Sequence, residues 1–234
     1  MLCFQAGGRE GWLHPIGPQT GELPLVWLLA GEMTQERLAE MESILLAQIA
    51  QGKCRPFVLA GFGPVDWDRD YAPWPLKTQD GRRFGSGAQA LTEYALQVFL
   101  PAAKAYFCSN GERYAVGYSL GGLAALYTGA QGQWTGVGSC SGSLWYPGFV
   151  EWFKQHPPRC PVYLSLGGKE KNTRDPLMAR VEECTRAVYE QLRGQNKTAF
   201  VHEPGGHFRD TAQRLSHAIT WLLGPAQSAR NASS

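Results

Sequence analysis

The sequence predicts an α/β fold in which helices cover both faces of a mainly parallel sheet. Strand-like apolar runs alternate with helix-like segments along most of its 234 residues, and this order is typical of parallel sheets with helical crossovers. The run 23–30 is apolar throughout, as expected of a strand buried on both faces. At 117–121, Gly-Tyr-Ser-Leu-Gly lies between a strand-like and a helix-like segment, which indicates a sharp strand-to-helix turn.

The first 90 residues supply the start of this sheet. Thr34 is a candidate N-cap for a helix that runs to about Gln51, with apolar residues at helical spacing. Residues 61–87 form a long loop rich in Gly, Pro, Trp and charge, and a loop of this length is usually functional. The strands expected in this part are 2–5, 12–16, 23–30 and 56–60.

The rest of the chain alternates helix and strand. A helix is expected over 88–107, with Pro101 breaking or kinking it near Leu100. Residues 224–234 are small and polar and are expected to fray. We find no linker, so we expect one domain over 1–234, without a separate lid domain. The further strands expected are 113–117, 134–140, 161–166 and 197–202, and the further helices are 120–130, 176–193 and 208–223.

Composition narrows the class of protein. With 44% hydrophobic residues, 18% charged residues and a net charge of +2, the chain has no electrostatic reason to bind nucleic acid or a membrane surface. No stretch reaches the ~18 apolar residues of a membrane span, and the first ten residues do not have the pattern of a signal peptide. The six cysteines form no CxxC pair, which favours reduced thiols, no zinc site and a cytoplasmic location.

Ser119 is the candidate nucleophile. It is the central residue of Gly-x-Ser-x-Gly, the turn that lifts a serine off the end of a strand and onto a helix N-terminus. Gly117 and Gly121 are small enough to let the backbone bend sharply there. The alternative is a glycine-rich connection that only packs tightly. A phosphate loop is excluded, because no Lys-Ser or Lys-Thr follows the glycines.

His207 is the candidate general base. A serine needs a base within hydrogen-bond reach, and in α/β-hydrolases that histidine follows the last strand. His207 lies directly after the strand 197–202, in a Gly-Gly-His-Phe turn. A metal site built on this histidine has little support, because few carboxylates or thiolates lie near it in sequence. The other four histidines are better explained as packing or surface residues: His14, His156, His202 and His217.

The acid that orients the base is either Glu170 or Asp175. Both follow the strand 161–166, where the chain order Ser, acid, His requires an acid. Asp175 precedes Pro176 and a helix-like stretch, so it already serves as an N-cap. Glu170 lies just past the strand end and has no such structural role, so we prefer it.

Two backbone N–H groups are expected to form an oxyanion hole. One belongs to Leu120, at the start of the helix after the nucleophile. The other should come from the turn after the strand 23–30, from Glu32 or alternatively Gly31. We prefer Glu32 with its carboxylate turned away, because a negative charge aimed into the hole would oppose catalysis.

With these residues the chain resembles the putative-esterase branch of the α/β-hydrolases, which includes esterase D and the siderophore esterases. The resemblance covers about residues 23–223 and implies an α/β-hydrolase fold and a Ser–His–acid esterase, with Ser119, His207 and Glu170 in the three roles. It also implies that Arg69 and Trp145 line the substrate pocket. The matching segments are 28–32, 69–73, 117–122, 141–145, 167–170 and 205–208.

The resemblance also bounds the function. The chain lacks the extra N-terminal domain of some siderophore esterases and starts its sheet in abbreviated form, which favours a small or medium ester over a bulky siderophore. We expect no metal or organic cofactor, and activity that falls as His207 becomes protonated. The alternatives are an acyltransferase or thioesterase with the same triad, and a non-catalytic binding protein on a hydrolase fold.

Overall fold

An eight-stranded sheet forms the centre of the molecule. The computed structural model describes residues 1–31 and 33–225. The strand order is β1-β2-β4-β3-β7-β8-β9-β10, and the six strands from β4 to β10 run parallel, whereas β1 and β2 are antiparallel to their neighbours. The strands are β1 (Leu2–Ala6), β2 (Arg9–Ile16), β3 (Leu23–Leu29), β4 (Phe57–Gly63), β7 (Ser109–Tyr118), β8 (Gly136–Cys140), β9 (Val162–Gly167) and β10 (Thr198–Glu203).

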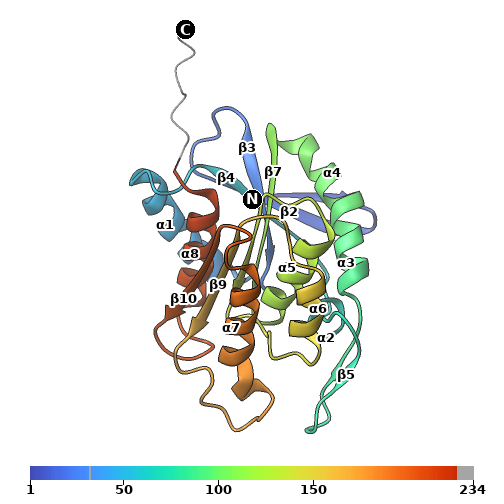
Figure 1. Cartoon of the computed structure of the whole chain (residues 1–234). Coiled ribbons are helices and arrows are strands. Elements are labelled where there is room, and N and C mark those ends of the chain that lie inside the picture. The colour runs from blue at the N-terminus through green and yellow to red at the C-terminus, as the bar shows by residue number, and fades with distance from the viewer. Residues whose placement is uncertain (32, 226–234) are drawn as a thin grey trace.

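Helices cover both faces of this sheet, as the sequence predicts. In Figure 1, α1 and α8 lie on the left of the sheet, and α3, α5 and α6 lie on its right. This arrangement is the mostly parallel α/β-hydrolase fold. The helices are α1 (Gln35–Ala50), α2 (Trp67–Asp70), α3 (Ala88–Tyr94), α4 (Leu100–Ala103), α5 (Leu120–Gln131), α6 (Phe149–Gln155), α7 (Val181–Leu192) and α8 (Thr211–Leu223).

The sheet separates two hydrophobic cores. In β3 every residue is buried, and successive side chains alternate between the faces. Trp27 packs into the core under α3, α5, α6 and α7, whereas Val26 and Leu28 pack into the core under α1 and α8. This two-sided burial explains why the sequence 23–29 is apolar without a break.

The segment 61–87 is more ordered than the loop that the sequence predicts. It contains α2, whose N-cap Asp66 accepts a hydrogen bond from the backbone N–H of Arg69 at 2.9 Å. It also contains a small hairpin, β5 (Leu76–Lys77) and β6 (Arg83–Phe84). Elements of two to four residues carry too little periodicity to be read from sequence.

Two other departures concern helices. The kink expected near Leu100 is a π-helical turn, η1 (Ala95–Phe99), between α3 and α4, and a 3₁₀ turn, η2 (Lys104–Tyr106), follows α4. The helix α6 between β8 and β9 was not predicted, and it is the only helix of the described residues in that connection, so no lid domain forms there. The expected fraying of 224–234 concerns residues that lie mostly outside the described ranges.

Candidate active site

Ser119 lies on a strained turn between β7 and α5. Its backbone has φ 56° and ψ −122°, a conformation that L residues rarely adopt. A Cβ on Gly117 would lie 2.0 Å from the carbonyl oxygen of Gly121, and one on Gly121 would lie 1.8 Å from the carbonyl oxygen of Leu29. Only glycine therefore fits two residues before and two residues after the serine. The Ser119 N–H donates to the Cys140 carbonyl at 3.0 Å and fixes the turn against β8.

Three side chains that are far apart in the sequence form one hydrogen-bonded row. The Nε2 atom of His207 lies 2.9 Å from Ser119 Oγ, and its Nδ1 atom lies 2.7 Å from Glu170 Oε2. They follow β7, β9 and β10, whose carboxyl ends share one edge of the sheet. The row joins a hydroxyl, an imidazole and a carboxylate in the order that proton transfer from a serine requires.

Glu170 is a buried carboxylate that the site keeps ionised. Its side chain is 3% exposed, compared with 30% for His207. Burial raises the pKa of Glu170, but the hydrogen bond and charge of His207, the hydroxyl of Ser141 and the N–H of Gly167 together lower it below its ordinary value. The Ser141 hydroxyl and the Gly167 N–H each donate to Oε1 at 2.7 Å.

Arg214 completes the surroundings of Glu170, and the sequence analysis did not identify it. Its Nη1 atom lies 2.9 Å from Glu170 Oε1, and its side chain is only 1% exposed. A signal was present: Arg214 precedes the apolar residues Leu215, Ala218 and Ile219 of α8, all of which are buried. A charged residue beside such an apolar stripe needs a buried partner.

Asp175, the alternative acid, lies elsewhere. Its Oδ1 atom accepts hydrogen bonds from the backbone N–H groups of Leu177 at 2.8 Å and Met178 at 3.1 Å. These bonds fix the segment just before the 3₁₀ turn η3 (Met178–Arg180). The helix expected from 176 starts only after this turn, at Val181. Of the two candidate acids, the structure brings Glu170 to His207.

Of the two expected oxyanion donors, only Leu120 lies within the residues that the structure describes. Leu120 is the first residue of α5 and lines the cavity beside Ser119. Gly31, in the turn after β3, has φ 70°. Glu32, the preferred second donor, lies outside the described residues.

The row of three side chains opens into a cavity of about 640 Å³. Trp145, which the resemblance implies as a pocket residue, lines this cavity, but Arg69 does not. Arg69 instead pairs with Asp70 at 2.8 Å, and its side chain is 63% exposed. Three other residues of the segment 61–87 do line the cavity: Trp67, Arg82 and Phe84.

The wall and rim of this cavity are aromatic and cationic. The rings of Phe84 and Trp145 meet edge to face, with centroids 6.5 Å apart. Arg82 lies over Phe84 and forms an ion pair with Asp68 at 2.6 Å. Phe208, next to the histidine, is 92% exposed at the rim. The cavity therefore offers flat apolar contacts together with cationic side chains.

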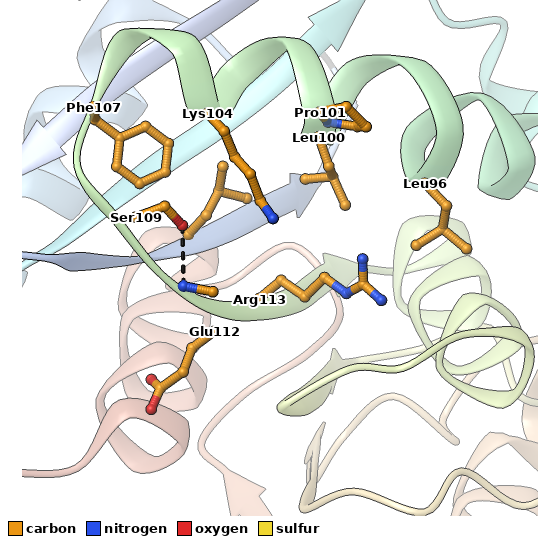
Figure 2. A pocket seen from close by; sticks show the side chains of 10 residues that line it. Leu96, Leu100, Pro101, Lys104, Phe107, Ser109, Glu112 and Arg113 are labelled. Atoms are coloured by element: carbon orange, nitrogen blue, oxygen red, sulfur yellow. Dashed lines mark hydrogen bonds between the residues drawn. The ribbon is translucent and has the colours of Figure 1, made fainter.

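A second hollow lies at the opposite end of β7 and is unsuited to this chemistry. It measures about 40 Å³ and is lined by the start of β7 and by residues from η1 to Phe107. Figure 2 shows Lys104 and Arg113 beside it, with apolar side chains such as Leu100 around them. It is far too small for a substrate and contains no nucleophile paired with a base.

Residues 1–31 and 33–225 were searched for membrane-spanning helices and for clusters that could bind a metal. None of their helices combines the length and hydropathy needed to cross a bilayer. Within the same ranges, no three His, Cys, Asp or Glu side chains gather in an arrangement that could hold a metal ion.

Comparison with known proteins identifies the family of the chain. The model of a family described as "Putative esterase" matches residues 11–213, most of the chain. No curated protein shows a significant sequence match to the chain.

Several solved structures share the fold at low identity. An IroE-like serine hydrolase from Shewanella oneidensis is 16% identical, with a TM-score of 0.75 over 92% of this chain and 75% of that one. The siderophore hydrolase EstB from Aspergillus nidulans is 15% identical, with a TM-score of 0.68 over 95% and 93%. The enterobactin esterase FES from Shigella flexneri is 21% identical, with a TM-score of 0.70, but only 55% of that chain is covered.

Proposed function

This chain belongs to the Putative esterase family, and we propose that it hydrolyses carboxylic esters through a triad of Ser119, His207 and Glu170. The observation that carries the proposal is the row of hydrogen bonds from Ser119 Oγ to His207 Nε2 at 2.9 Å and from His207 Nδ1 to Glu170 Oε2 at 2.7 Å. The strained turn under the serine supports the same assignment, because it presents the hydroxyl at the cavity floor.

The reaction has two halves. Ser119 Oγ attacks the ester carbonyl while His207 Nε2 takes the hydroxyl proton, and the imidazolium then gives that proton to the departing alcohol oxygen. Water attacks the acyl-enzyme in the same way and returns the proton to Ser119. Glu170 stays ionised throughout; it fixes the tautomer of His207 and stabilises its charged form.

The negative charge on the carbonyl oxygen needs donors that are already in place. We assign one to the N–H of Leu120, where the positive end of α5 also favours an anion. We assign the second to the turn after β3. The candidates at that turn are the N–H of Glu32 and, alternatively, that of Gly31.

The cavity supports a small or medium ester as substrate. Its volume of about 640 Å³ lies within the range of sites for drug-sized ligands. We assign Trp67, Phe84 and Trp145 to contacts with the apolar part of the ester. Of the similar structures, one is named a siderophore hydrolase and one an enterobactin esterase, but they are at most 21% identical to this chain. We therefore propose the natural ester by its size and apolar character.

Hydrolysis of p-nitrophenyl acetate, butyrate and octanoate tests the triad. We expect the wild type to turn over at least one ester, and Ser119→Ala to lower kcat/KM by about a thousandfold or more. Ser43→Ala, at an exposed position of α1, is the matched control and should keep wild-type activity. A fluorophosphonate probe should label the wild type and Ser43→Ala but not Ser119→Ala. Equal labelling of all three proteins would refute the assignment of the nucleophile.

A further inference from the structure

We propose that Arg214 is a positioning residue of this site, which holds Glu170 and the loop of His207 in place relative to each other. Its positive charge also sets the lowest pH at which the enzyme remains active. The inference rests on the proposed triad and extends it to a residue that contacts neither Ser119 nor the cavity. It concerns how the acid and the base are held, not a new step in the reaction.

The Arg214 guanidinium is fully buried and makes five hydrogen bonds. From α8, Nη1 donates to Glu170 Oε1 at 2.9 Å, to Ser141 Oγ at 2.8 Å and to Tyr118 Oη at 3.2 Å. Nη2 donates to the carbonyl oxygens of Pro204 and Gly206, both at 2.9 Å. Two of these partners are backbone carbonyls in the loop that carries His207.

These partners come from four neighbouring strands. Tyr118 ends β7, and the other side chains and carbonyls follow β8, β9 and β10, which lie side by side in that order. One rigid planar group therefore ties together the loops that carry the acid and the base. Tyr118 reinforces this arrangement, because its hydroxyl also donates to the backbone carbonyl of His207. The close approach leaves no spare room: a Cβ on Gly167 would lie 2.8 Å from Arg214 Nη2.

The charge of Arg214 acts on the same carboxylate from its other side. Glu170 turns Oε2 to His207 and Oε1 to Arg214, and the Glu170 and Arg214 side chains are 3% and 1% exposed. Because an arginine stays protonated, Glu170 and Arg214 already form a neutral pair. A proton on His207 then leaves a net positive charge in a buried cluster. Without Arg214, the imidazolium would pair with an uncompensated carboxylate and form more easily.

The other charged or titratable groups around this cluster do not supply the same effect. The Tyr118 hydroxyl is neutral and its pKa is raised, first of all by burial. Lys169 is exposed at the cavity. Two neighbouring carboxylates have partners of their own: Asp210 pairs with Arg209 at 3.1 Å, and Glu203 lies 3.0 Å from His217 Nδ1.

Arg214→Lys and Arg214→Met separate position from charge. Lysine keeps the charge but loses the planar fork, whereas methionine keeps most of the volume and loses both. With p-nitrophenyl butyrate from pH 4.5 to 9, we expect both variants to lower kcat by about tenfold or more. Only Arg214→Met should move the acid limb of the kcat/KM profile, to higher pH by about one unit. Arg186→Met, on the surface of α7, is the matched control and should leave the profile unchanged.

The outcomes are distinguishable. If Arg214 only anchors the fold, replacing it would lower kcat or the yield of folded protein but leave the acid limb of the kcat/KM profile in place. An unmoved acid limb in a folded Arg214→Met therefore overturns the role of the charge. Wild-type kcat in both variants overturns the positioning role.

Arg214→Gln replaces Arg214→Met if circular dichroism shows that methionine prevents folding. If neither neutral variant folds, the charge serves the fold, and its role in the pH profile is wrong. If Ser119→Ala keeps full activity, the proposed function itself has failed.

Discussion

Glu170 divides its two carboxylate oxygens between two tasks. Oε2 contacts only the imidazole of His207, at 2.7 Å, whereas Oε1 accepts hydrogen bonds from Arg214, Ser141 and the Gly167 N–H. The three donors on Oε1 hold the carboxylate still and ionised, which leaves Oε2 free to orient the histidine. The buried charge is tolerated here because these hydrogen bonds replace its lost hydration.

Trp145 is the residue whose role in substrate binding can be tested most simply. Its side chain lines the cavity and meets Phe84 edge to face. We expect Trp145→Ala to raise KM for p-nitrophenyl octanoate by about tenfold, the equivalent of ~1.4 kcal/mol of lost contact, and to change KM for the acetate much less. Steady-state kinetics on the ester series measures both.

Trp152 provides the control for that variant. It stacks on Tyr127, with ring centroids 4.7 Å apart, and does not line the cavity. Trp152→Ala should therefore lower stability but leave KM for every ester unchanged. An equal rise in KM for the acetate and the octanoate in Trp145→Ala would contradict the assignment of this tryptophan to the acyl chain.

Single residues of the site differ in how far the sequence could predict them. Ser119 and His207 stood out because a local motif and a position after a strand are both visible in the chain. Glu170 needed a comparison with Asp175, which the capping pattern at Pro176 made possible. Arg214 had only a weak local signal, its place beside the apolar residues of α8, and its partner Glu170 could not be predicted from that pattern. The ion pair of Arg69 with Asp70 likewise became visible only in the structure.

At the scale of elements, the turn between β7 and α5 decides whether the serine can be presented at all. Nearly all of α5 is buried, and its first turn lies directly against the end of β3. The helix can start this close to the sheet only because Gly121 has no side chain to separate it from the Leu29 carbonyl. The strained serine is thus held by packing on both sides of the turn.

Gly121→Ala should therefore prevent folding and not merely reduce activity. Its new Cβ would lie 1.8 Å from a backbone oxygen, and neither α5 nor β3 can shift without disturbing the core. We expect little or no soluble protein, or a melting temperature lowered by more than about 10 °C. Thermal melting followed by circular dichroism gives the measurement.

Gly206→Ala is the matched substitution. A Cβ at that position meets nothing within 4 Å, and its φ is not positive, so the variant should melt close to the wild type. If Gly121→Ala melts as high as Gly206→Ala, the packing account of the turn is wrong.

Elements were predictable where they are long and regular. The strands from β3 to β10 in the main sheet and the helices α1, α5 and α8 follow apolar runs or helical stripes that the sequence displays. The short pieces α2, β5 and β6 span two to four residues. They depend on the Asp66 cap of α2, on contacts of α2 with α3 and β6, and on the pairing of β5 with β6. The helix α6 was missed because its seven residues, none of them Ala or Leu, give only two turns of signal.

At the scale of the whole molecule, the parallel sheet is what brings the site together. Residues 119, 170 and 207 are separated by 51 and 37 positions, but each follows a strand that runs in the same direction. Their loops therefore emerge at one edge, beside the turn after β3. The alternation of strands and helices predicts this convergence, whereas the distances within it depend on side-chain packing and could not be predicted.

The burial of Glu170 also connects the site to the acid stability of the molecule. Its pKa is lowered in the folded protein from an ordinary value of 4.5. A carboxyl with a lowered pKa stabilises the fold when it is ionised, and this contribution is lost as the pH falls from 4.5 through the lower native value. We expect the free energy of unfolding, measured with urea, to change little between pH 5.5 and 7 and to fall steeply below about pH 4.5.

Glu170→Gln should remove part of that acid dependence and destabilise the protein at pH 7. The variant leaves Arg214 buried without a counter-charge, a loss that costs about 3 kcal/mol, and it has no carboxyl at this position to protonate. Its urea midpoint should therefore be lower at pH 7 and approach the wild-type midpoint as the pH falls to 3.5. Glu183→Gln, which removes an exposed partner of Arg180, should run parallel to the wild type across the same range. If Glu170→Gln also runs parallel, the buried pair does not control acid stability, and Arg214 must be satisfied chiefly by the carbonyls of Pro204 and Gly206.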